Sequence, residues 1–378
     1  MILLPPEFDD IRPYYDSEIP AAMERMASDP ILIPALKFLG HDIDVESFKA
    51  LLRSIKTIDQ FQLEVMLPLC RVLVDKTMDE FTSSGADKID GSYGTLYVSN
   101  HRDIVMDAYL HQIVLHSHGL ETCHITFGSN LMEPRFVVDF GLSNKMFKTD
   151  RKTSNIRSFM RSMMHLSAYI NYVVPHGESL WIAQRNGRTK DGFDRTEPGL
   201  IRMFLMSGSD KLQVEALHIT PLAISYQWEP CDILKAVELY HTMGGKPYVK
   251  AKGEDLQSIV TGITSPKGKV HLSVGKPIDV TGFCDPLRRE DLNSITAQID
   301  AQIWNGYRLW DTNYIAWDLL NGSSRFVGLY TYEQKEYFLE KMRHAISSYP
   351  SLDEAKLREI YLKIYAGPVY TNPEALKS

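Results

Sequence analysis

Short runs of mostly apolar residues recur between positions 94 and 277, and longer amphipathic segments separate them. Runs of this length, bounded by polar, proline or glycine residues, are typical of buried strands. We therefore predict strands at residues 95–99, 123–128, 170–174, 180–183, 217–226 and 270–274.

Two of the separating segments, residues 104–116 and 153–168, have helical periodicity. In the second, Ile156, Phe159 and Met163 fall on one face and Arg157 lies off it. Strands that alternate with helices in this way form βαβ units, whose strands are parallel. The sequence therefore predicts an α/β fold: a three-layer domain with a mostly parallel central sheet.

The first 84 residues predict helices. The stretch from Asp16 to Pro20 is typical of a helix start, with a capping side chain and a proline in the first turn. Residues 58–81 predict a further helix, which we expect to bend at Pro68 because proline lacks a backbone donor. Residues 83–87, which include two serines and a glycine, are the predicted linker to the α/β domain.

Helical patterns return in the last part of the chain. One helix is marked by apolar residues at helical spacing: Leu292, Ile295, Ile299 and Ile303. Ser351 and Glu354 predict a capping box for another helix, which we expect to end at Gly367-Pro368. We therefore expect an N-terminal helical segment (1–84), an α/β domain (85–284) and a C-terminal helical segment (285–378).

The composition narrows the class of protein. With 44% hydrophobic and 24% charged residues, the chain is typical of a globular protein. A net charge of −7 disfavours nucleic acid as the main partner. The four cysteines are far apart and form no CxxC pair, so we expect reduced thiols, a cytoplasmic setting and no structural zinc. No apolar run approaches the length of a bilayer span, so any membrane contact is expected to be peripheral.

Polar residues directly follow the predicted strand at 95–99: Asn100, His101, Arg102, Asp103 and, further on, Asp107. In a parallel sheet the ligand site lies beyond the carboxyl ends of the strands, where these residues are expected. An imidazole has a pKa near neutrality, and a carboxylate on its far nitrogen fixes the tautomer and raises the basicity. The pattern predicts that His101 is a general base, with Asp107 or Asp103 as its partner.

Three further blocks in the predicted α/β domain carry polar chemistry. They are Gly128-Ser129-Asn130-Leu131, closing at Phe147-Lys148-Thr149-Asp150-Arg151; Arg185-Asn186-Gly187-Arg188-Thr189-Lys190-Asp191-Gly192; and Ile219-Thr220-Pro221-Leu222. A glycine-flanked turn that carries Arg188 and Lys190 at a strand end suits an anion, because guanidinium binds phosphate in a bidentate fashion. We expect Arg151 to close on the same anion.

In this order, the four blocks resemble those of the glycerol-phosphate acyltransferase superfamily, and most closely its glycerol-3-phosphate branch. The resemblance covers residues 95–228. It implies that His101 takes the proton from an acceptor hydroxyl and that the alkoxide attacks the thioester of an acyl donor directly. It also implies that the donor is acyl-carrier protein or coenzyme A, and that neither a metal nor another cofactor is used.

The resemblance also implies the site residues. Asp107, or failing that Asp103, orients the imidazole. The expected substrate-binding residues are Asn100, Arg102, Asn130, Arg151, Arg185, Gly187, Arg188 and Lys190.

Two positions depart from the family pattern. Five residues, where the family usually has four, lie between His101 and Asp107, and on a helix this turns the carboxylate by about 100°. In the third block Arg185 replaces the family's glutamate, so Gln184 is the alternative contact for an acceptor hydroxyl. The acceptor is therefore expected to be glycerol 3-phosphate, a lysophospholipid or another lyso- or amino-lipid.

Other functions fit the sequence less well. His101-Arg102-Asp103 and Asp139-Phe140-Gly141 occur in the order found in kinases, but the metal-binding asparagine of a kinase is replaced by Ala108. The chain has no G-x-S-x-G motif, which a serine hydrolase requires. A non-catalytic lipid-binding homologue remains as the alternative.

Residues 146–164 combine phenylalanine and methionine with lysine and arginine. This mixture predicts contact with the surface of an anionic membrane, and it equally suits an acidic acyl-carrier protein. We therefore expect a peripheral protein of phospholipid synthesis on the cytoplasmic face of the membrane. The aromatic residues between 304 and 317 are expected to pack on the α/β domain.

Overall fold

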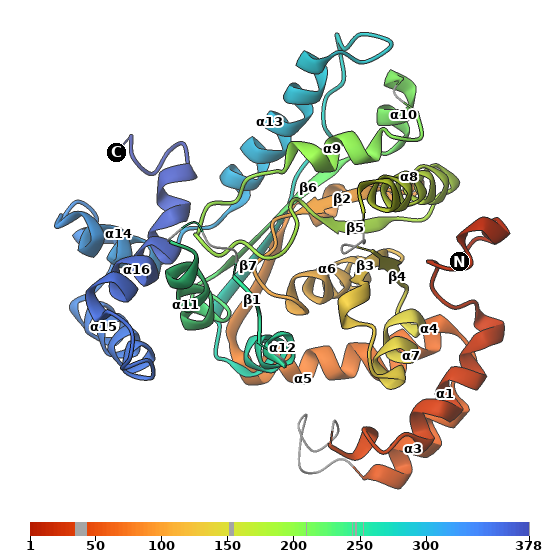
Figure 1. Cartoon of the computed structure of the whole chain (residues 1–378), viewed down its shortest axis with the longest axis horizontal. Helices are drawn as coiled ribbons and strands as arrows, with labels where there is room; N and C mark the ends of the chain where they lie inside the picture. The colour runs from red at the N-terminus through yellow and green to blue at the C-terminus, as the bar shows by residue number, and fades with distance from the viewer. Residues whose placement is uncertain are drawn as a thin grey trace.

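The computed structural model describes residues 1–34, 44–150, 155–208, 210–243, 245, 248–251 and 253–377. Within these residues a seven-stranded sheet runs through the centre of the molecule, in the order β1-β7-β6-β2-β5-β3-β4 (Figure 1). The strands are β1 (Met78–Ser84), β2 (Leu96–Ser99), β3 (His124–Gly128), β4 (Met146–Thr149), β5 (Leu180–Ala183), β6 (Thr220–Tyr226) and β7 (Gly268–Val274). Only β6 and β7 pair antiparallel, so the predicted mostly parallel sheet is confirmed.

Helices cover both faces of the sheet, which gives the predicted three layers (Figure 1). One face carries α8 (Ile156–Val173), α9 (Pro198–Phe204), α10 (Lys211–Ala216) and α13 (Arg289–Gly306). The other carries α5 (Leu67–Thr77), α6 (Met106–Ser117), α7 (Arg135–Ser143) and α12 (Glu254–Thr264). Along β2, Leu96 and Val98 pack on the α8 side while Tyr97 packs on the α6 side, as the alternation of a strand requires.

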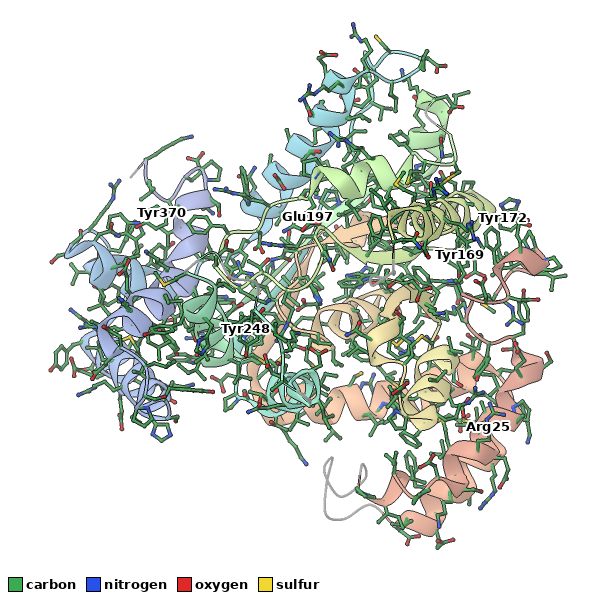
Figure 2. All side chains as sticks on the ribbon, in the orientation of Figure 1. Arg25, Tyr169, Tyr172, Glu197, Tyr248 and Tyr370 are labelled. Carbon is green, nitrogen blue, oxygen red and sulfur yellow. The ribbon has the colours of Figure 1, made fainter. Side chains whose placement is uncertain are left out.

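The N-terminal helices form a smaller core of their own at the lower right of Figure 1. They are α1 (Ile19–Ser28), α3 (Val45–Ser54), α4 (Ile58–Phe61) and the π-helical η3 (Gln62–Met66), which leads into α5. This core is shared with Tyr109 of α6 and Phe140 of α7. Arg25 of α1 (Figure 2) also pairs with Asp139 of α7 at 2.7 Å, so the N-terminal helices are fixed to the α/β domain.

The C-terminal helices pack together at the opposite end of the sheet (Figure 1). They are α14 (Asp311–Asn321), α15 (Tyr332–Ser347) and α16 (Glu354–Thr371). They share a core with α11 (Asp232–Thr242), and this core includes Trp228. Short 3₁₀ helices complete the description: η1 (Pro6–Phe8), η2 (Asp16–Glu18), η4 (Ala86–Lys88), η5 (Ser129–Leu131), η6 (Val174–His176) and η7 (Val327–Leu329). In the described part of the chain, no helix is both long and apolar enough to cross a membrane.

The strand predicted at 170–174 is wrong, because these residues form the end of α8 and the start of η6. Leu166, Ile170 and Val173 are buried at helical spacing and continue the inner face of α8. The β-branched residues of this segment, Ile170, Val173 and Val174, have a high strand propensity, although the segment is a helix that packs on the sheet.

The helix predicted at 58–81 is wrong beyond Thr77, where β1 begins. β1 pairs in parallel with β7, so the sheet starts before the boundary expected at residue 84. The predicted linker is a tight turn, since Gly85 has φ +77° and a Cβ there would lie 2.2 Å from the carbonyl oxygen of Val274.

The start and end predicted for the last helix are also wrong. The N-cap of α16 is Asp353, whose carboxylate accepts a hydrogen bond from the backbone N–H of Lys356 at 3.0 Å. The helix continues through Gly367 and Pro368 to Thr371. The apolar face predicted for α13 is confirmed, with Ile295, Ile299 and Ile303 buried.

Candidate active site

His101 lies in the loop that follows β2, one of the central strands of the sheet. Its Nδ1 is 2.9 Å from Oδ2 of Asp107, which also accepts hydrogen bonds from the backbone N–H groups of Arg102 (2.6 Å) and Asp103 (2.9 Å). The chain is not helical until Met106, so most of the residues between His101 and Asp107 lie in the loop. Asp107 is therefore the carboxylate that contacts the imidazole.

Asp103 has a different role. Its Oδ1 accepts hydrogen bonds from the backbone N–H groups of Val105 (2.9 Å) and Met106 (2.8 Å), which caps the start of α6. Its Oδ2 is buried and has no hydrogen-bond partner among the described residues. Asp103 thus shapes the loop that holds His101 and does not contact the ring.

The hydrogen-bond network fixes the tautomer of His101. A carboxylate only accepts, so Nδ1 donates to Asp107 and Nε2 keeps its lone pair. Nε2 has no hydrogen-bond partner in the described part of the chain, and the imidazole lines a cavity. Trp181 of β5 packs edge-on against the ring with centroids 5.8 Å apart, which restrains its orientation.

The cavity has a volume of about 600 Å³ and extends from His101 between the helices on one face of the sheet. Its polar end includes Asn130, Arg188, Lys190 and Asp255. The rest of the lining is largely apolar. Much of it comes from helices α1, α3, α5, α6, α7 and α12, and strands β3, β4 and β5 also contribute; it includes Leu32, Phe48, Leu52, Leu69, Phe136, Phe140 and Ile259. The site therefore combines a base, a polar compartment and a long apolar compartment.

Arg188 follows Gly187, whose φ of +76° turns the chain back toward His101 after β5. The next amide, that of Thr189, donates to the carbonyl oxygen of His101 at 2.7 Å, so this turn and the base are held together. The side chain of Arg188 lines the cavity with the residue only 8% exposed, and its Nη1 has no hydrogen-bond partner among the described residues. A buried guanidinium nitrogen in this position is suited to bind an anion.

Lys190 and Asn130 reach the same end of the cavity, each with an acidic neighbour. Lys190 pairs with Glu238 of α11, and the amide of Asn130 donates to Asp255 at 3.3 Å. The structure thus brings together His101, Asn130, Gly187, Arg188 and Lys190 among the residues predicted to form the site.

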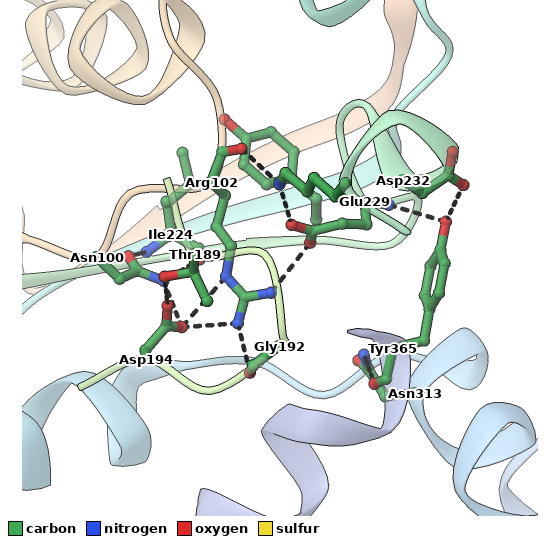
Figure 3. Close-up of polar contacts among 12 residues, drawn as sticks. Asn100, Arg102, Thr189, Gly192, Asp194, Ile224, Glu229, Asp232, Asn313 and Tyr365 are labelled. Atoms are coloured by element: carbon green, nitrogen blue, oxygen red, sulfur yellow. Dashed lines mark hydrogen bonds and ion pairs between the residues drawn. The ribbon is translucent and has the colours of Figure 1, made fainter. Parts of the chain in front are cut away.

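Asn100 has a structural role and is not among the residues that line the cavity (Figure 3). Its amide donates to Asp194 and to the carbonyl oxygen of Ile224, both at 2.9 Å, and accepts from the N–H of Ile224 at 2.7 Å. These bonds join the residue that follows β2 to Ile224 within β6, and they use the amide groups that a substrate would need.

Arg102 is also corrected from a substrate contact to a structural residue (Figure 3). Its guanidinium bonds to Asp194, Glu229 and the carbonyl oxygen of Gly192, with the residue only 1% exposed. Burial alone would lower the pKa of Arg102, but the two carboxylates outweigh it and raise the pKa well above its ordinary value. Lys235 completes the group by binding the other oxygen of Glu229 at 2.5 Å.

The remaining predicted residues are not brought to the cavity by the described structure. Arg185 is half-buried and is not among the residues that line it. Gln184 is fully buried, and its side-chain oxygen accepts from the hydroxyl of Thr196 at 3.3 Å. Arg151 lies outside the described residues.

Sequence reasoning missed Tyr226, Asp194 and Glu229. Tyr226 donates to Oδ1 of Asp107 at 2.7 Å, and the two acids neutralise Arg102. The available signal was weak: Tyr226 ends the predicted strand at 217–226, and each acid directly follows an aromatic residue, Phe193 or Trp228. In the described part of the chain, no group of three or more His, Cys, Asp or Glu side chains is arranged to hold a metal ion.

Comparisons with known proteins add little to this geometry. No family model and no curated protein sequence matches the chain. A similar solved structure is that of the 1-acyl-sn-glycerophosphate (LPA) acyltransferase PlsC from Thermotoga maritima. It is 13% identical, with a TM-score of 0.34, and the alignment covers 74% of this chain and 91% of that one. A likeness at this identity and TM-score does not identify the reaction of this protein.

Proposed function

We propose that the protein is an O-acyltransferase that moves a fatty acyl group from a thioester to a hydroxyl of glycerol 3-phosphate or a lysophospholipid. The observation that carries the proposal is the position of His101, which lines the cavity together with Gly187 and Arg188 and whose Nε2 has no hydrogen-bond partner in the described residues. A base between a compartment for an acyl chain and a compartment for an anion suits this reaction.

The chemistry needs one base and no covalent acyl-enzyme. Nε2 of His101 takes the proton of the acceptor hydroxyl, and the alkoxide oxygen forms a bond to the thioester carbonyl carbon. The tetrahedral intermediate collapses with cleavage of the carbon–sulfur bond, and the leaving thiolate receives the proton from the imidazolium. Asp107 holds the ring through Nδ1–H and stabilises its positive charge.

The apolar compartment supports a fatty acyl donor. Its walls are leucine, phenylalanine, methionine and isoleucine side chains of the N-terminal helices and of α5, α7 and α12. Each methylene of a chain buried there contributes about 0.8 kcal/mol to binding. The thioester would then lie at the polar end, beside His101, with acyl-carrier protein or coenzyme A as the leaving group.

The polar compartment supports an acceptor that carries a phosphate. Arg188 offers a buried guanidinium nitrogen that has no partner among the described residues, while Lys190 and Asn130 offer further donors. In the proposal Arg188 holds the phosphate first, and Lys190 exchanges Glu238 for it. Arg151, which lies outside the described residues, is proposed as a further ligand of the same anion. A lyso- or amino-lipid acceptor is the alternative for this compartment.

The exposed start of α8 supports contact with a membrane surface. Ile156 is 77% exposed and Met164 is 53% exposed, and Arg157 and Arg161 lie between them in sequence. α8 follows β4, whose carboxyl end lies at the same edge of the sheet as His101. Apolar side chains can insert into the membrane surface, and neighbouring arginine side chains attract anionic lipid headgroups. We therefore propose peripheral binding on the cytoplasmic face, with an acidic acyl-carrier protein as the alternative partner of this surface.

The test is an assay of the purified full-length protein. Acyl-coenzyme A and acyl-carrier protein with labelled acyl chains are each offered with glycerol 3-phosphate, lysophosphatidate and lyso-aminolipids. Transfer to one acceptor is expected, and His101→Ala should reduce it by a factor of about 10² to 10⁴ without loss of the fold. A folded protein that binds lipid equally well with and without His101, and transfers no acyl group, would instead be a lipid-binding protein.

A further inference from the structure

Tyr226 ends β6 beside the loop that holds His101, and the residue is only 1% exposed. Its hydroxyl donates to Oδ1 of Asp107 at 2.7 Å. This is the oxygen that His101 does not use, since the imidazole and two backbone N–H groups occupy Oδ2. Both oxygens of the Asp107 carboxylate are therefore held, each from a different part of the fold.

We infer that Tyr226 is a positioning residue of the proposed base. It begins a chain of hydrogen bonds that runs from Tyr226 through Asp107 to His101. The inference rests on the proposed function only for its kinetic consequence, because the chain itself is a property of the folded protein. β6 supplies the hydroxyl, α6 the carboxylate and the loop after β2 the imidazole. Since β2 and β6 are neighbouring strands of the sheet, their pairing sets the distance along this chain.

The hydroxyl acts on both the geometry and the charge of Asp107. It prevents rotation of the carboxylate, so that Oδ2 stays directed at Nδ1 of His101. It also withdraws part of the negative charge from the carboxylate, because a hydrogen bond to the ionised form stabilises that form. Without the hydroxyl, Oδ1 is buried and unpaired, and the carboxylate binds a proton or an imidazolium more strongly. Loss of the hydroxyl should therefore raise the pH at which the pair of Asp107 and His101 takes up a proton.

Two further acids, Asp103 and Glu229, act on the hydroxyl of Tyr226. Burial and the neighbouring Asp107, Asp103 and Glu229 raise the pKa of Tyr226 well above its ordinary value, so the hydroxyl stays a donor. Glu229 is paired with Arg102 and Lys235. Cys231 and Lys267 interact with the charge of Asp103, and Cys231 also interacts with Arg188.

The experiment follows the imidazole of His101 by ¹⁵N NMR in the full-length protein, with His101→Gln used to assign its signals. In Tyr226→Phe we expect the titration of His101 to move to higher pH by roughly half a unit to one unit. The matched control is Tyr169→Phe on α8 (Figure 2), which removes one buried hydroxyl that bonds to His124 at 2.7 Å. That variant should leave the titration of His101 unchanged.

A second substitution guards against a folding defect in Tyr226→Phe. Site-specific 3-fluorotyrosine at position 226 keeps the side chain and strengthens its hydroxyl as a donor, so the titration should move to lower pH. In acyl transfer, Tyr226→Phe should lower kcat about tenfold with KM unchanged and move the acidic limb of the rate profile to higher pH. It should add little in the background of Asp107→Asn.

The two arms separate the inference from the proposed function. If His101 titrates at the same pH in the wild type, Tyr226→Phe and the fluorotyrosine protein, Tyr226 does not act through Asp107 and the inference is overturned. If the titration shifts as expected but no acceptor is acylated, the chain exists and the proposed reaction is wrong.

Discussion

Asp107 Oδ2 lies 2.9 Å from Nδ1 of His101, although five residues separate the two in the sequence. In a continuous helix this spacing would turn the carboxylate well away from the face that carries the imidazole, since each residue adds about 100°. Here residues 100–105 form a loop, and α6 begins at Met106. Backbone N–H groups of the loop close on the same carboxylate oxygen, so the loop itself fixes the pair.

This geometry predicts different outcomes for the two acids. Asp107→Asn should reduce acyl transfer on the order of 100-fold, because the neutral amide no longer supports the imidazolium. Asp103→Asn should cost at most a few-fold, since its amide oxygen can still accept from Val105 and Met106. The values of kcat at several pH values, with circular dichroism as a check of folding, measure both. Equal losses in the two variants would contradict the assignment.

The parts of the fold that the sequence predicted are the buried ones. β2, β5 and β6 are almost wholly buried and read as apolar runs. β1 and β4 lie at the edges of the sheet, and β1 is largely exposed, so its sequence MDEFTSS shows no apolar run. Residues 170–174, which we predicted as a strand, have a strand-like composition. They are helical because this face of α8 packs on the sheet, and that contact is not visible in the local sequence.

The site was predictable where its residues are neighbours in sequence. His101 and Asp107 come from one stretch, and Arg188 comes from the turn after a predicted strand. Arg102 could not be judged locally, because its partners Asp194 and Glu229 lie 92 and 127 positions away. An arginine beside the candidate base can point into the cavity or into the protein, and long-range ion pairs decide which.

Replacement of Arg102 should affect stability. Arg102→Met leaves the buried Asp194 without its countercharge, so we expect a loss of about 3–5 kcal/mol in the free energy of unfolding. Urea unfolding measures this change. Adding Asp194→Asn should recover part of the loss, whereas Arg343→Met on the exposed face of α15 should change the stability by less than about 0.5 kcal/mol. An unfolding midpoint of Arg102→Met equal to that of the wild type would exclude the structural role.

His111 predicts a dependence of stability on pH. It lies one turn beyond Asp107 on α6, and burial lowers its pKa from 6.5 to about 3. The unfolded chain binds a proton at this position below about pH 6.5, while the folded protein does not until about pH 3. The contribution of His111 to the free energy of unfolding is therefore fully present above about pH 6.5, and it is lost as the pH decreases toward 3.

His111→Phe removes this contribution and tests it. Between pH 6.5 and pH 5 the wild type should lose roughly 1–2 kcal/mol more unfolding free energy than the variant. Urea titrations of both proteins at closely spaced pH values give the two slopes. Parallel slopes would mean that His111 binds a proton equally well in the folded and unfolded states.

Gly367 of α16 lies directly against the turn that bears Arg188. A Cβ at position 367 would lie 2.6 Å from the carbonyl carbon and oxygen of Gly192, which is close enough to force the backbone to move. The same carbonyl oxygen accepts from Arg102 at 3.1 Å, and Thr189 in this turn donates to His101. α16 therefore contacts the turn that is hydrogen-bonded to the backbone of His101.

Gly367→Ala should displace this turn, with a cost of about 1–3 kcal/mol in stability. Because the turn holds the backbone of His101 and the side chain of Arg188, kcat should fall and KM for a phosphate-bearing acceptor should rise. Gly199→Ala in α9 is the matched control, since a Cβ there meets no atom within 4 Å. It should be neutral or stabilise the protein by up to about 1 kcal/mol, because alanine reduces the entropy of the unfolded chain. If both variants unfold at the same urea concentration and turn over alike, α16 does not position the turn.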